Sequence, residues 1–236
     1  MPRRAFLLRY ARPQPPDAET EAKYLRRWAA RDLYRSPHAF PNIASKTLFG
    51  DGKPLEFEIG AGTGEFLCDM AARRRDVNFV GCDISLKSLL LAVERARSLS
   101  HDNVIFIQTP VRYLYPLLPT GSLQAVYLHF PEPFLKPSTR KHRVFNAGFL
   151  DNVHSALAPG GRLSVATDSE EAILAMLALL EADPRFRKTH VERYLRGLEA
   201  GVKSRYQEYW ERLGVPVLRF EAQKLPSPTP PPPPQA

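Results

Sequence analysis

The sequence predicts an α/β fold with a mostly parallel seven-stranded sheet and helices on both of its faces. Two observations predict it. Short apolar and β-branched runs alternate with segments of helical periodicity along most of the chain, which is typical of domains built from strand–helix–strand units. The runs are nearly continuously apolar, as expected for parallel strands that are buried on both faces. With 236 residues, 44% of them hydrophobic, the chain can bury one substantial core.

Seven segments have the composition of strands. They are Leu55–Ile59, Asn78–Ile84, Asn103–Ile107, Leu123–Phe130, Arg162–Thr167, a segment around His190–Arg193, and Val217–Glu221. Helical patterns fill most of the gaps, at Glu65–Arg75, Leu86–Ser98, Val144–Leu157 and Glu170–Ala182. Asp168 and Ser169 provide a capping signal before the last of these helices. The Pro159-Gly160-Gly161 turn is expected to feed the fifth strand.

The two ends of the chain differ in composition from its middle. Residues 1–20 carry four prolines among basic residues, so we expect a flexible N-terminal arm. Residues 226–236 are mostly proline, which predicts a disordered, extended tail that either recruits a proline-reading module or has no role in chemistry. Residues 21–225 are expected to form the globular domain, beginning with a basic helix.

Composition limits the class of partner and the compartment. The formal net charge is +8 and the pI about 9.6, which favours a polyanion such as nucleic acid, with a membrane surface as the alternative. No apolar run approaches the roughly 20 residues of a membrane span, so we expect a cytoplasmic protein. Cys68 and Cys82 are spaced neither as a metal clip nor as a redox pair and should be buried, reduced thiols. No histidine has ligand spacing, and no metal site is predicted.

A glycine-rich turn follows the first predicted strand. Gly60, Gly62 and Gly64 stand between Leu55–Ile59 and the helix expected from Glu65, at the edge where open α/β sheets bind ligands. The dinucleotide fingerprint G-x-G-x-x-G would require glycine at position 65 or 67, which Glu65 and Leu67 occupy. A nicotinamide-dependent oxidoreductase is therefore disfavoured.

Two acidic residues flank this turn. Glu58 comes two positions before Gly60 and can accept from the ammonium group of a cationic amino acid. Asp83 ends the second predicted strand, where a carboxylate can accept both hydroxyls of a ribose. Together they indicate an adenosyl amino acid, S-adenosylmethionine, with NAD as the alternative ligand. The alternative without a ligand is a turn that serves only strand-to-helix geometry, with Asp83 capping the next helix.

A second polar segment follows the fourth predicted strand. Glu132 stands between Pro131 and Pro133, and the basic run Arg140–Arg143 comes shortly afterwards. The prolines restrict the backbone around Glu132, and the cations can contact phosphate, unless they form an ordinary solvated loop. The Asn/Asp-Pro-Pro-aromatic pattern of amino-group methyltransferases is absent.

With these motifs in order, the sequence resembles the bacterial tRNA (guanine-N7-)-methyltransferases over roughly Leu55 to Leu213. The matching segments are Phe57 to Gly60 with its glycines, Phe130 to Phe134 where the family has F-P-D-P-W, Lys141 to Arg143, Ala166 to Asp168, and Ser204 to Gln207 before Arg212 to Gly214. The resemblance implies a class I S-adenosylmethionine-dependent methyltransferase with a Rossmann-like fold. It also implies transfer of a methyl group to N7 of a tRNA guanine, at position 46 of the variable loop.

The resemblance also implies residue roles. Glu58, Gly60, Gly62, Gly64, Asp83 and Thr109 would hold S-adenosylmethionine, with Glu132 beside the donor in place of the family's essential aspartate. Lys136, Asp168, Ser204, Arg205, Tyr206 and Gln207 would contact the substrate nucleotide, and Arg140, Lys141, His142 and Arg143 its phosphates.

Four of these positions depart from the family pattern. Thr109 stands where an aspartate is usual, Glu132 is one methylene longer, Phe134 replaces tryptophan and Gln207 replaces a glutamate. The change at Thr109 loses an acceptor for the adenine amino group. The alternatives are thus a methyltransferase for another RNA or base position, and an RNA-binding protein that has lost turnover.

The N-terminal segment offers a second basic stripe. Arg27, Arg31 and Arg35 recur every four residues, so a helix from about Glu21 would carry them on one face, either toward phosphate or as an ordinary solvated face. Tyr24 and Trp28, at the same spacing, are expected to pack rather than to stack on bases.

Overall fold

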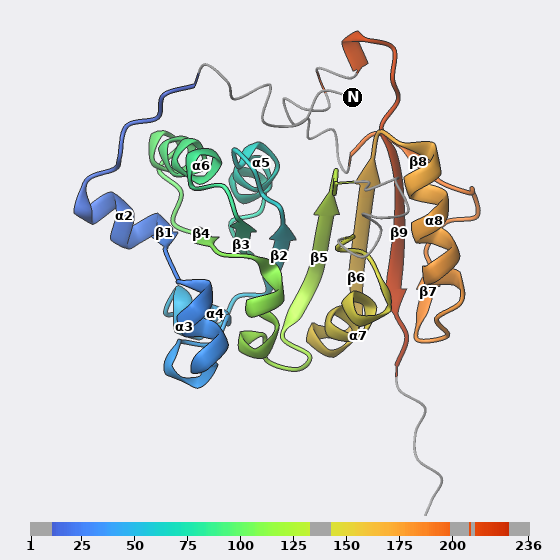
Figure 1. The fold of residues 1–236 in the computed structure, drawn as a ribbon, viewed down its shortest axis with the longest axis horizontal. Helices are drawn as coiled ribbons and strands as arrows, with labels where there is room; N and C mark the ends of the chain where they lie inside the picture. The colour runs from blue at the N-terminus through green and yellow to red at the C-terminus, as the bar shows by residue number, and fades with distance from the viewer. Residues whose placement is uncertain (1–10, 133–142, 199–207, 209–210, 227–236) are drawn as a thin grey trace, which may run out of the picture.

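The computed structural model describes residues 11–132, 143–198, 208 and 211–226. Its strands form one sheet in the order β1-β4-β3-β2-β5-β6-β9-β7, with β8 paired to β9 (Figure 1). The strands are β1 Leu25–Arg26, β2 Leu55–Ile59, β3 Asn78–Asp83, β4 Val104–Gln108, β5 Leu123–His129, β6 Leu157–Thr167, β7 Phe186–Lys188, β8 Leu195–Arg196 and β9 Leu218–Lys224. From β1 to β6 the neighbours pair in parallel, whereas β9 runs antiparallel to β6, β7 and β8.

The described sheet has nine strands where the sequence predicts seven. Six of the predicted strands form, whereas β1, β7 and β8 were not predicted; β1 and β8 have only two residues each. The strand predicted around His190–Arg193 is wrong, because those residues form a bend between β7 and β8. The ring Nδ1 of His190 lies 2.9 Å from the Glu192 carbonyl oxygen, and Lys188 Nζ donates to the same oxygen at 2.8 Å. These side-chain contacts satisfy backbone groups that a strand ladder would otherwise pair.

The helices are α2 Ala18–Tyr24, α3 Ala30–Arg35, η1 Pro37–Ala39, α4 Ser45–Leu48, α5 Glu65–Arg73, α6 Leu86–Ser98, η2 Val111–Tyr113, η3 Tyr115–Leu117, α7 Ala147–Ala156 and α8 Glu170–Glu181. Four of them, α5 to α8, lie close to predicted segments, and the others were not predicted at these bounds. Side-chain oxygens of Ser85, Asn146 and Ser169 cap α6, α7 and α8. Each cap satisfies a backbone N–H that the first helical turn leaves without a partner.

The prediction of a single basic helix from about Glu21 is wrong. α2 ends at Tyr24, and Leu25 and Arg26 pair with Phe106 and Ile107 of β4 before α3 begins. Sheet hydrogen bonds at this edge and burial of Tyr24 and Leu25 outweigh continuation of the helix. Arg27, Arg31 and Arg35 therefore do not share one helix face. α2 also begins inside the 1–20 segment expected to be a flexible arm, with Asp17 as its cap.

The packing predicted for the aromatic residues of this segment is confirmed. Tyr24 is buried, and its hydroxyl donates to the carbonyl oxygen of His101 at 2.7 Å. Trp28 packs against the core, with its ring 5.6 Å from that of Phe40 in an edge-to-face arrangement. Both rings thus stabilise the fold.

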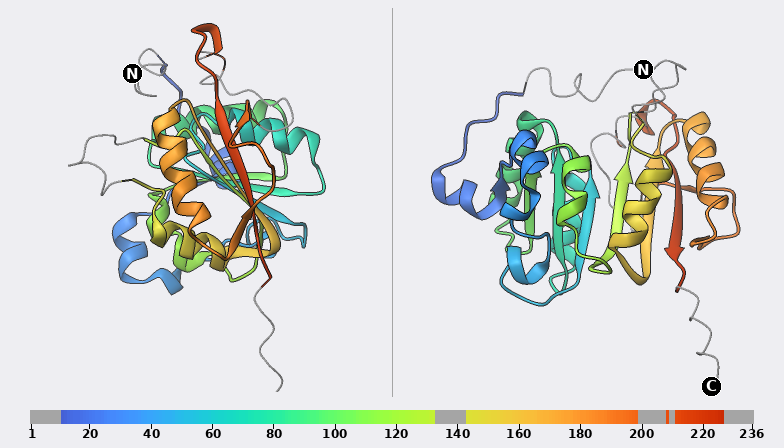
Figure 2. Two further views of the ribbon diagram at one scale, coloured as in Figure 1. Left: turned by 90° about the vertical axis from the view of Figure 1, so that its right-hand side faces the viewer. Right: turned by 60° about the horizontal axis from the view of Figure 1, so that its bottom comes forward.

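The sheet has a hydrophobic core on each face, so the predicted covering of both faces is confirmed. On one face, Phe66 and Met70 of α5 and Leu89 of α6 pack with residues of β3, β4 and β5. On the other, residues of α3, α7 and α8 such as Leu33 and Phe149 pack on the sheet. Figure 2 shows α7 and α8 together beside β6 and β9. The carboxyl ends of the parallel strands remain at one edge between these layers.

The cysteines are free and buried, as predicted. Burial raises the pKa of Cys68 to about 12, which disfavours the thiolate form at neutral pH. Among the described residues, no group of three or more His, Cys, Asp and Glu side chains is placed to hold a metal ion. None of the described helices combines the length and apolarity needed to cross a membrane.

Candidate active site

The glycine turn joins β2 to α5 through left-handed backbone. Gly60, Gly62 and Gly64 have φ values of +79°, +57° and +72°, which disfavour any residue with a Cβ atom. The Gly60 and Ala61 N–H groups donate to the Cys82 carbonyl oxygen at the end of β3. The turn therefore lies against the neighbouring strand, in a backbone conformation that glycine adopts without strain.

Asp83 fixes the turn from the side of β3. Its Oδ2 accepts from the Gly62 N–H at 2.9 Å, and its Oδ1 accepts from the Ser85 N–H at 2.8 Å. A carboxylate offers about four acceptor positions, so two remain for the hydroxyls of a ribose. The structure thus brings Gly62 and Asp83 into direct contact, although 21 positions separate them.

Thr109 lies immediately after β4, the strand next to β3. Its backbone N–H donates to the Asp83 carbonyl oxygen at 3.1 Å. Its side-chain hydroxyl is buried and has no hydrogen-bond partner among the residues that the structure describes. A hydroxyl can both donate and accept, so Thr109 offers a polar contact at the position where the family pattern has an aspartate.

Glu58 lies near the end of β2 and is only 3% exposed. Its Oε1 is 3.3 Å from His129 Nδ1 at the end of β5. Its Oε2 is buried and finds no hydrogen bond within the described part of the chain. A buried acceptor without a donor is costly, and the ammonium group of an amino acid would supply the missing donor.

The chain turns sharply after β5. Phe130 has φ +50°, a left-handed conformation that is unusual for a bulky residue and costs on the order of 1–3 kcal/mol. Its N–H donates to the Ala166 carbonyl oxygen at 2.7 Å, and its side chain is buried. These interactions hold the strained turn and direct Pro131 and Glu132 away from the sheet.

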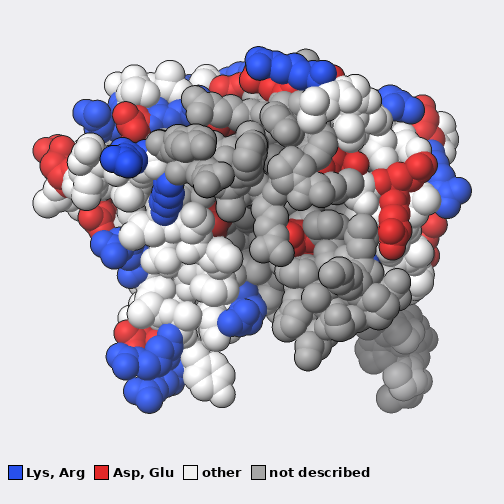
Figure 3. All heavy atoms as spheres, turned by 45° about the horizontal axis from the view of Figure 1, so that its top comes forward, with Lys and Arg blue, Asp and Glu red and all other residues white. Residues whose placement is uncertain are grey.

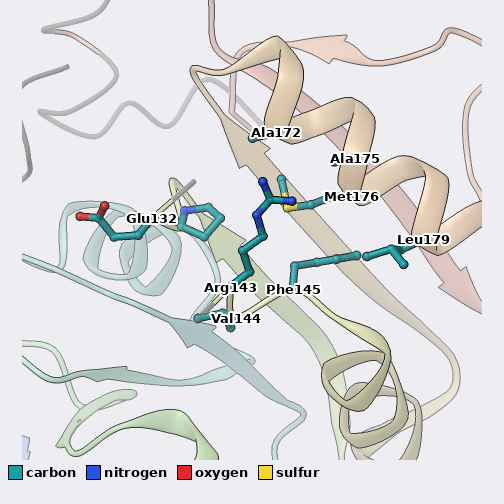
Figure 4. A pocket seen from close by; sticks show the side chains of 9 residues that line it. Glu132, Arg143, Val144, Phe145, Ala172, Ala175, Met176 and Leu179 are labelled. Carbon is teal, nitrogen blue, oxygen red and sulfur yellow. The ribbon is translucent and has the colours of Figure 1, made fainter. Parts of the chain in front are cut away.

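Glu132 is exposed and borders a mostly apolar pocket between this segment and α8 (Figure 4). Its carboxylate points away from the other labelled side chains, whereas the Arg143 guanidinium extends toward Met176. The pocket is lined by Pro131, Glu132, Arg143, Val144, Phe145, Ala172, Ala175, Met176 and Leu179. Because it includes neither Glu58, Asp83 nor the glycines, we assign it to positioning of the Glu132 segment rather than to the cofactor.

Asp168 is half-buried after β6, the next strand along from β5. It precedes Ser169, whose side chain accepts from the Ala172 N–H at the start of α8. The Phe130 hydrogen bond to Ala166 brings this strand end beside the Glu132 segment. Asp168 and Glu132 therefore follow adjacent strands at the same edge of the sheet.

Several predicted site residues lie outside the described residues: Lys136, Arg140, Lys141, His142, Ser204, Arg205, Tyr206 and Gln207. Phe134 is also among them. Of the basic run, Arg143 is described and half-buried. On the face in Figure 3, basic and acidic side chains are intermixed around residues drawn in grey, with one group of basic side chains at the lower left.

His129 is the site residue that sequence reasoning did not assign. It is buried and borders Phe66, with ring centroids 4.5 Å apart. Its position as a polar residue at the end of an apolar strand could have indicated a site residue. Its pairing with Glu58, however, depends on the register of β2 and β5, which aligns Ile59 with Leu128.

The residues present fit S-adenosylmethionine. Glycines with left-handed backbone, a buried acceptor on Glu58 and open acceptor positions on Asp83 suit its adenosyl and amino-acid parts. The strand order, with the last long strand antiparallel, and this site at the carboxyl ends of β2 and β3 define a class I S-adenosylmethionine-dependent methyltransferase.

Solved structures agree with this class. An rRNA methylase from Streptococcus thermophilus matches with a TM-score of 0.51 and 16% identity, over 75% of this chain and 89% of its own. A 30S ribosomal A1408 methyltransferase from an uncultured bacterium matches with a TM-score of 0.54 and 15% identity, over 85% and 96%. At these identities the likeness shows the fold alone.

Sequence relatives define the family. A family model described as "Putative methyltransferase" matches residues 52–220. The tRNA (guanine-N(7)-)-methyltransferase of Rubrobacter xylanophilus is 48% identical over 88% of this chain and 93% of its own, and that of Chloroherpeton thalassium is 38% identical over 88% and 92%. The chain belongs to the tRNA (guanine-N7-)-methyltransferase family, and the resemblance stated from its motifs is confirmed.

Proposed function

We propose that this chain transfers a methyl group from S-adenosylmethionine to N7 of a guanine in tRNA. The observation that carries the proposal is the 48% identity to a tRNA (guanine-N(7)-)-methyltransferase over nearly the whole of both chains. The arrangement of the glycines, Glu58 and Asp83 supports the same conclusion. A tRNA substrate supports a cytoplasmic location, which is part of the proposal.

The reaction requires alignment rather than a general base. The bound sulfonium supplies an electrophilic methyl group, and guanine N7 has a lone pair and no proton to remove. The chain must therefore hold the acceptor in line and stabilise the positive charge that develops on the purine. Carboxylates are suited to both tasks.

Glu132 and Asp168 are the carboxylates we assign to the base. They follow the adjacent strands β5 and β6 at the edge where the glycine turn ends β2. Guanine presents N1–H and an amino group as donors, which a carboxylate can accept while N7 faces the methyl group. Adenine lacks this pair of donors, so the same contact selects guanine.

The substrate guanine must be accessible in the plane of its ring. The deep, narrow major groove of an A-form helix prevents such an approach to a paired base. We therefore propose an unstacked or displaced guanine, for which the tRNA variable loop at position 46 is suitable. Arg143, with Arg140, Lys141 and His142, would contact the neighbouring phosphates.

The test is incubation of the full chain with labelled S-adenosylmethionine and an unmodified tRNA transcript, followed by nucleoside analysis. We expect 7-methylguanosine as the labelled product. A transcript in which the variable-loop guanine is replaced by adenine is the matched control and should remain unlabelled. Label in a different nucleoside would overturn the N7 assignment, and absence of label from every tRNA would favour an RNA-binding protein without turnover.

A further inference from the structure

An aromatic pair with one exposed ring lies where α3 meets η2. Tyr34 of α3 is 78% exposed, and its ring centroid lies 6.5 Å from that of Tyr113, with the planes 82° apart. An edge-to-face contact uses at most one face of a ring, so Tyr34 offers open ring surface to solvent, whereas Tyr113 is half-buried and supports it from below.

The pair is held on a rigid support. Leu33, the neighbour of Tyr34, is buried in the core on that face of the sheet. Tyr113 packs against the same core and belongs to η2, which begins two residues after Thr109. The tyrosines are therefore fixed relative to the strand end that contributes Thr109 to the cofactor site.

Two arginines belong to the same segments as the aromatic pair. The Arg112 guanidinium lies 4.7 Å from the centroid of the Tyr113 ring, and Arg35 follows Tyr34 on α3; both arginines are exposed. Within the described residues neither arginine forms an ion pair, whereas Arg31 pairs with Asp32 at 3.1 Å. Figure 3 shows basic side chains gathered at the lower left, the side on which Figure 1 places α3 and α4.

From this combination we propose that Tyr34, Tyr113, Arg35 and Arg112 form a second RNA-docking surface, which we call the Tyr34 surface. The exposed Tyr34 ring, held by Tyr113, stacks on an unpaired base, and the arginines contact the phosphates beside it. This inference rests on the proposed function, because the RNA is taken to be the tRNA substrate. The Tyr34 surface would bind that tRNA at a place distant from the methylated guanine. The unpaired positive charge distinguishes an RNA partner from an apolar protein partner.

The experiment measures tRNA binding by fluorescence anisotropy over a range of salt concentrations. Tyr34→Ala should weaken affinity about 5- to 100-fold, the usual effect of losing one stacked base, without changing the slope of log affinity against log salt. Tyr34→Phe keeps the ring and should bind like the wild type. Arg112→Ala should make the slope shallower by roughly 0.7–0.9.

The matched control is Arg187→Ala, because Arg187 is an exposed arginine on β7, at the opposite edge of the sheet from β1. It should leave tRNA affinity and slope unchanged, and all four variants should bind S-adenosylmethionine as the wild type does. At saturating tRNA, Tyr34→Ala should keep wild-type turnover, since Tyr34 lies outside the site that we assign to the cofactor and the base.

Unchanged tRNA affinity in Tyr34→Ala would overturn the Tyr34 surface, and so would equal losses for Tyr34→Ala and Tyr34→Phe. The wild-type methylation assay separates this failure from failure of the proposed function. If the wild type is active and the Tyr34→Ala variant binds tRNA as the wild type does, only the proposed Tyr34 surface is refuted. If the wild type is inactive but its tRNA binding still depends on the Tyr34 ring, only the proposed methylation reaction is refuted.

Discussion

Glu56 and Glu58 lie on the same face of β2, and both are buried, yet their carboxylates meet different partners. Glu56 accepts from Arg74 at 2.7 Å and from the Tyr127 hydroxyl at 2.8 Å. Tyr127 in turn accepts from Arg162 at 3.0 Å. Both Glu56 oxygens are thus satisfied within the fold, whereas one oxygen of Glu58 has no hydrogen bond among the described residues.

This difference predicts opposite results for a matched pair of variants. Glu58→Gln should weaken S-adenosylmethionine binding about 10- to 150-fold, because a hydrogen bond to a charged group contributes about 1.5–3 kcal/mol. Glu56→Gln should leave that affinity unchanged and lower the free energy of unfolding by about 1–3 kcal/mol. Calorimetry and urea unfolding measure the two quantities. Equal loss of cofactor affinity in both variants would contradict the assignment of Glu58.

Glu132 is the residue we expect to contribute most to turnover. Glu132→Gln keeps the shape but removes the charge, and we predict a fall in kcat of about 10²- to 10³-fold with tRNA affinity retained within a few fold. Because Glu132 is exposed, the fold should be unaffected. Glu181→Gln, an exposed glutamate at the end of α8, is the control. Near wild-type turnover of Glu132→Gln would refute charge stabilisation by this residue.

At the scale of elements, the start of α5 depends on the absence of a side chain at Gly64. A Cβ atom there would lie 2.7 Å from the Cβ of Ala92 on α6, and the backbone has φ +72°. The glycine therefore allows both the left-handed turn and the close approach of α5 to α6.

Gly64→Ala should lower the free energy of unfolding by about 2–4 kcal/mol, from overpacking together with left-handed strain. Gly50→Ala is the matched control, since Gly50 has φ +79° and a Cβ atom added there would meet nothing within 4 Å; it should cost only about 1–2 kcal/mol. Urea unfolding of both variants measures the difference. Equal costs would mean that contact with Ala92 contributes nothing.

For the whole molecule, three histidines link stability to pH. Burial lowers the pKa of His101, His154 and His190 below the ordinary value of 6.5. Between their folded pKa values and 6.5 the unfolded chain binds more protons than the folded one. The stabilisation is therefore complete above pH 6.5 and is lost as pH falls through the folded values.

We predict that the free energy of unfolding is lower at about pH 5.5 than at about pH 7.5, and that His101→Gln reduces this difference. His101 is fully buried, whereas His38 is exposed, so His38→Gln is the control and should keep the wild-type pH dependence. Urea unfolding at both pH values provides the measurement. A wild-type free energy that does not change over this range would contradict the proposed linkage.

Local sequence determined much of this protein. Glycines that tolerate left-handed backbone, apolar runs of strand length and capping residues such as Ser169 act within a few positions, so β2, α6 and the turn between β2 and α5 could be predicted. The strand ends that carry Asp83 and Glu132 followed from the same patterns. The family could also be identified from its ordered motifs.

Only the tertiary structure decided which distant residues meet. The pairing of β1 with β4 interrupted the predicted basic helix, and the register of β2 and β5 placed His129 against Glu58. The packing of α3 against η2 brought Tyr34 to Tyr113. Such contacts join residues tens of positions apart. They form only when the sheet hydrogen bonds and the buried core of the whole domain form. For that reason no local pattern in the sequence specified them.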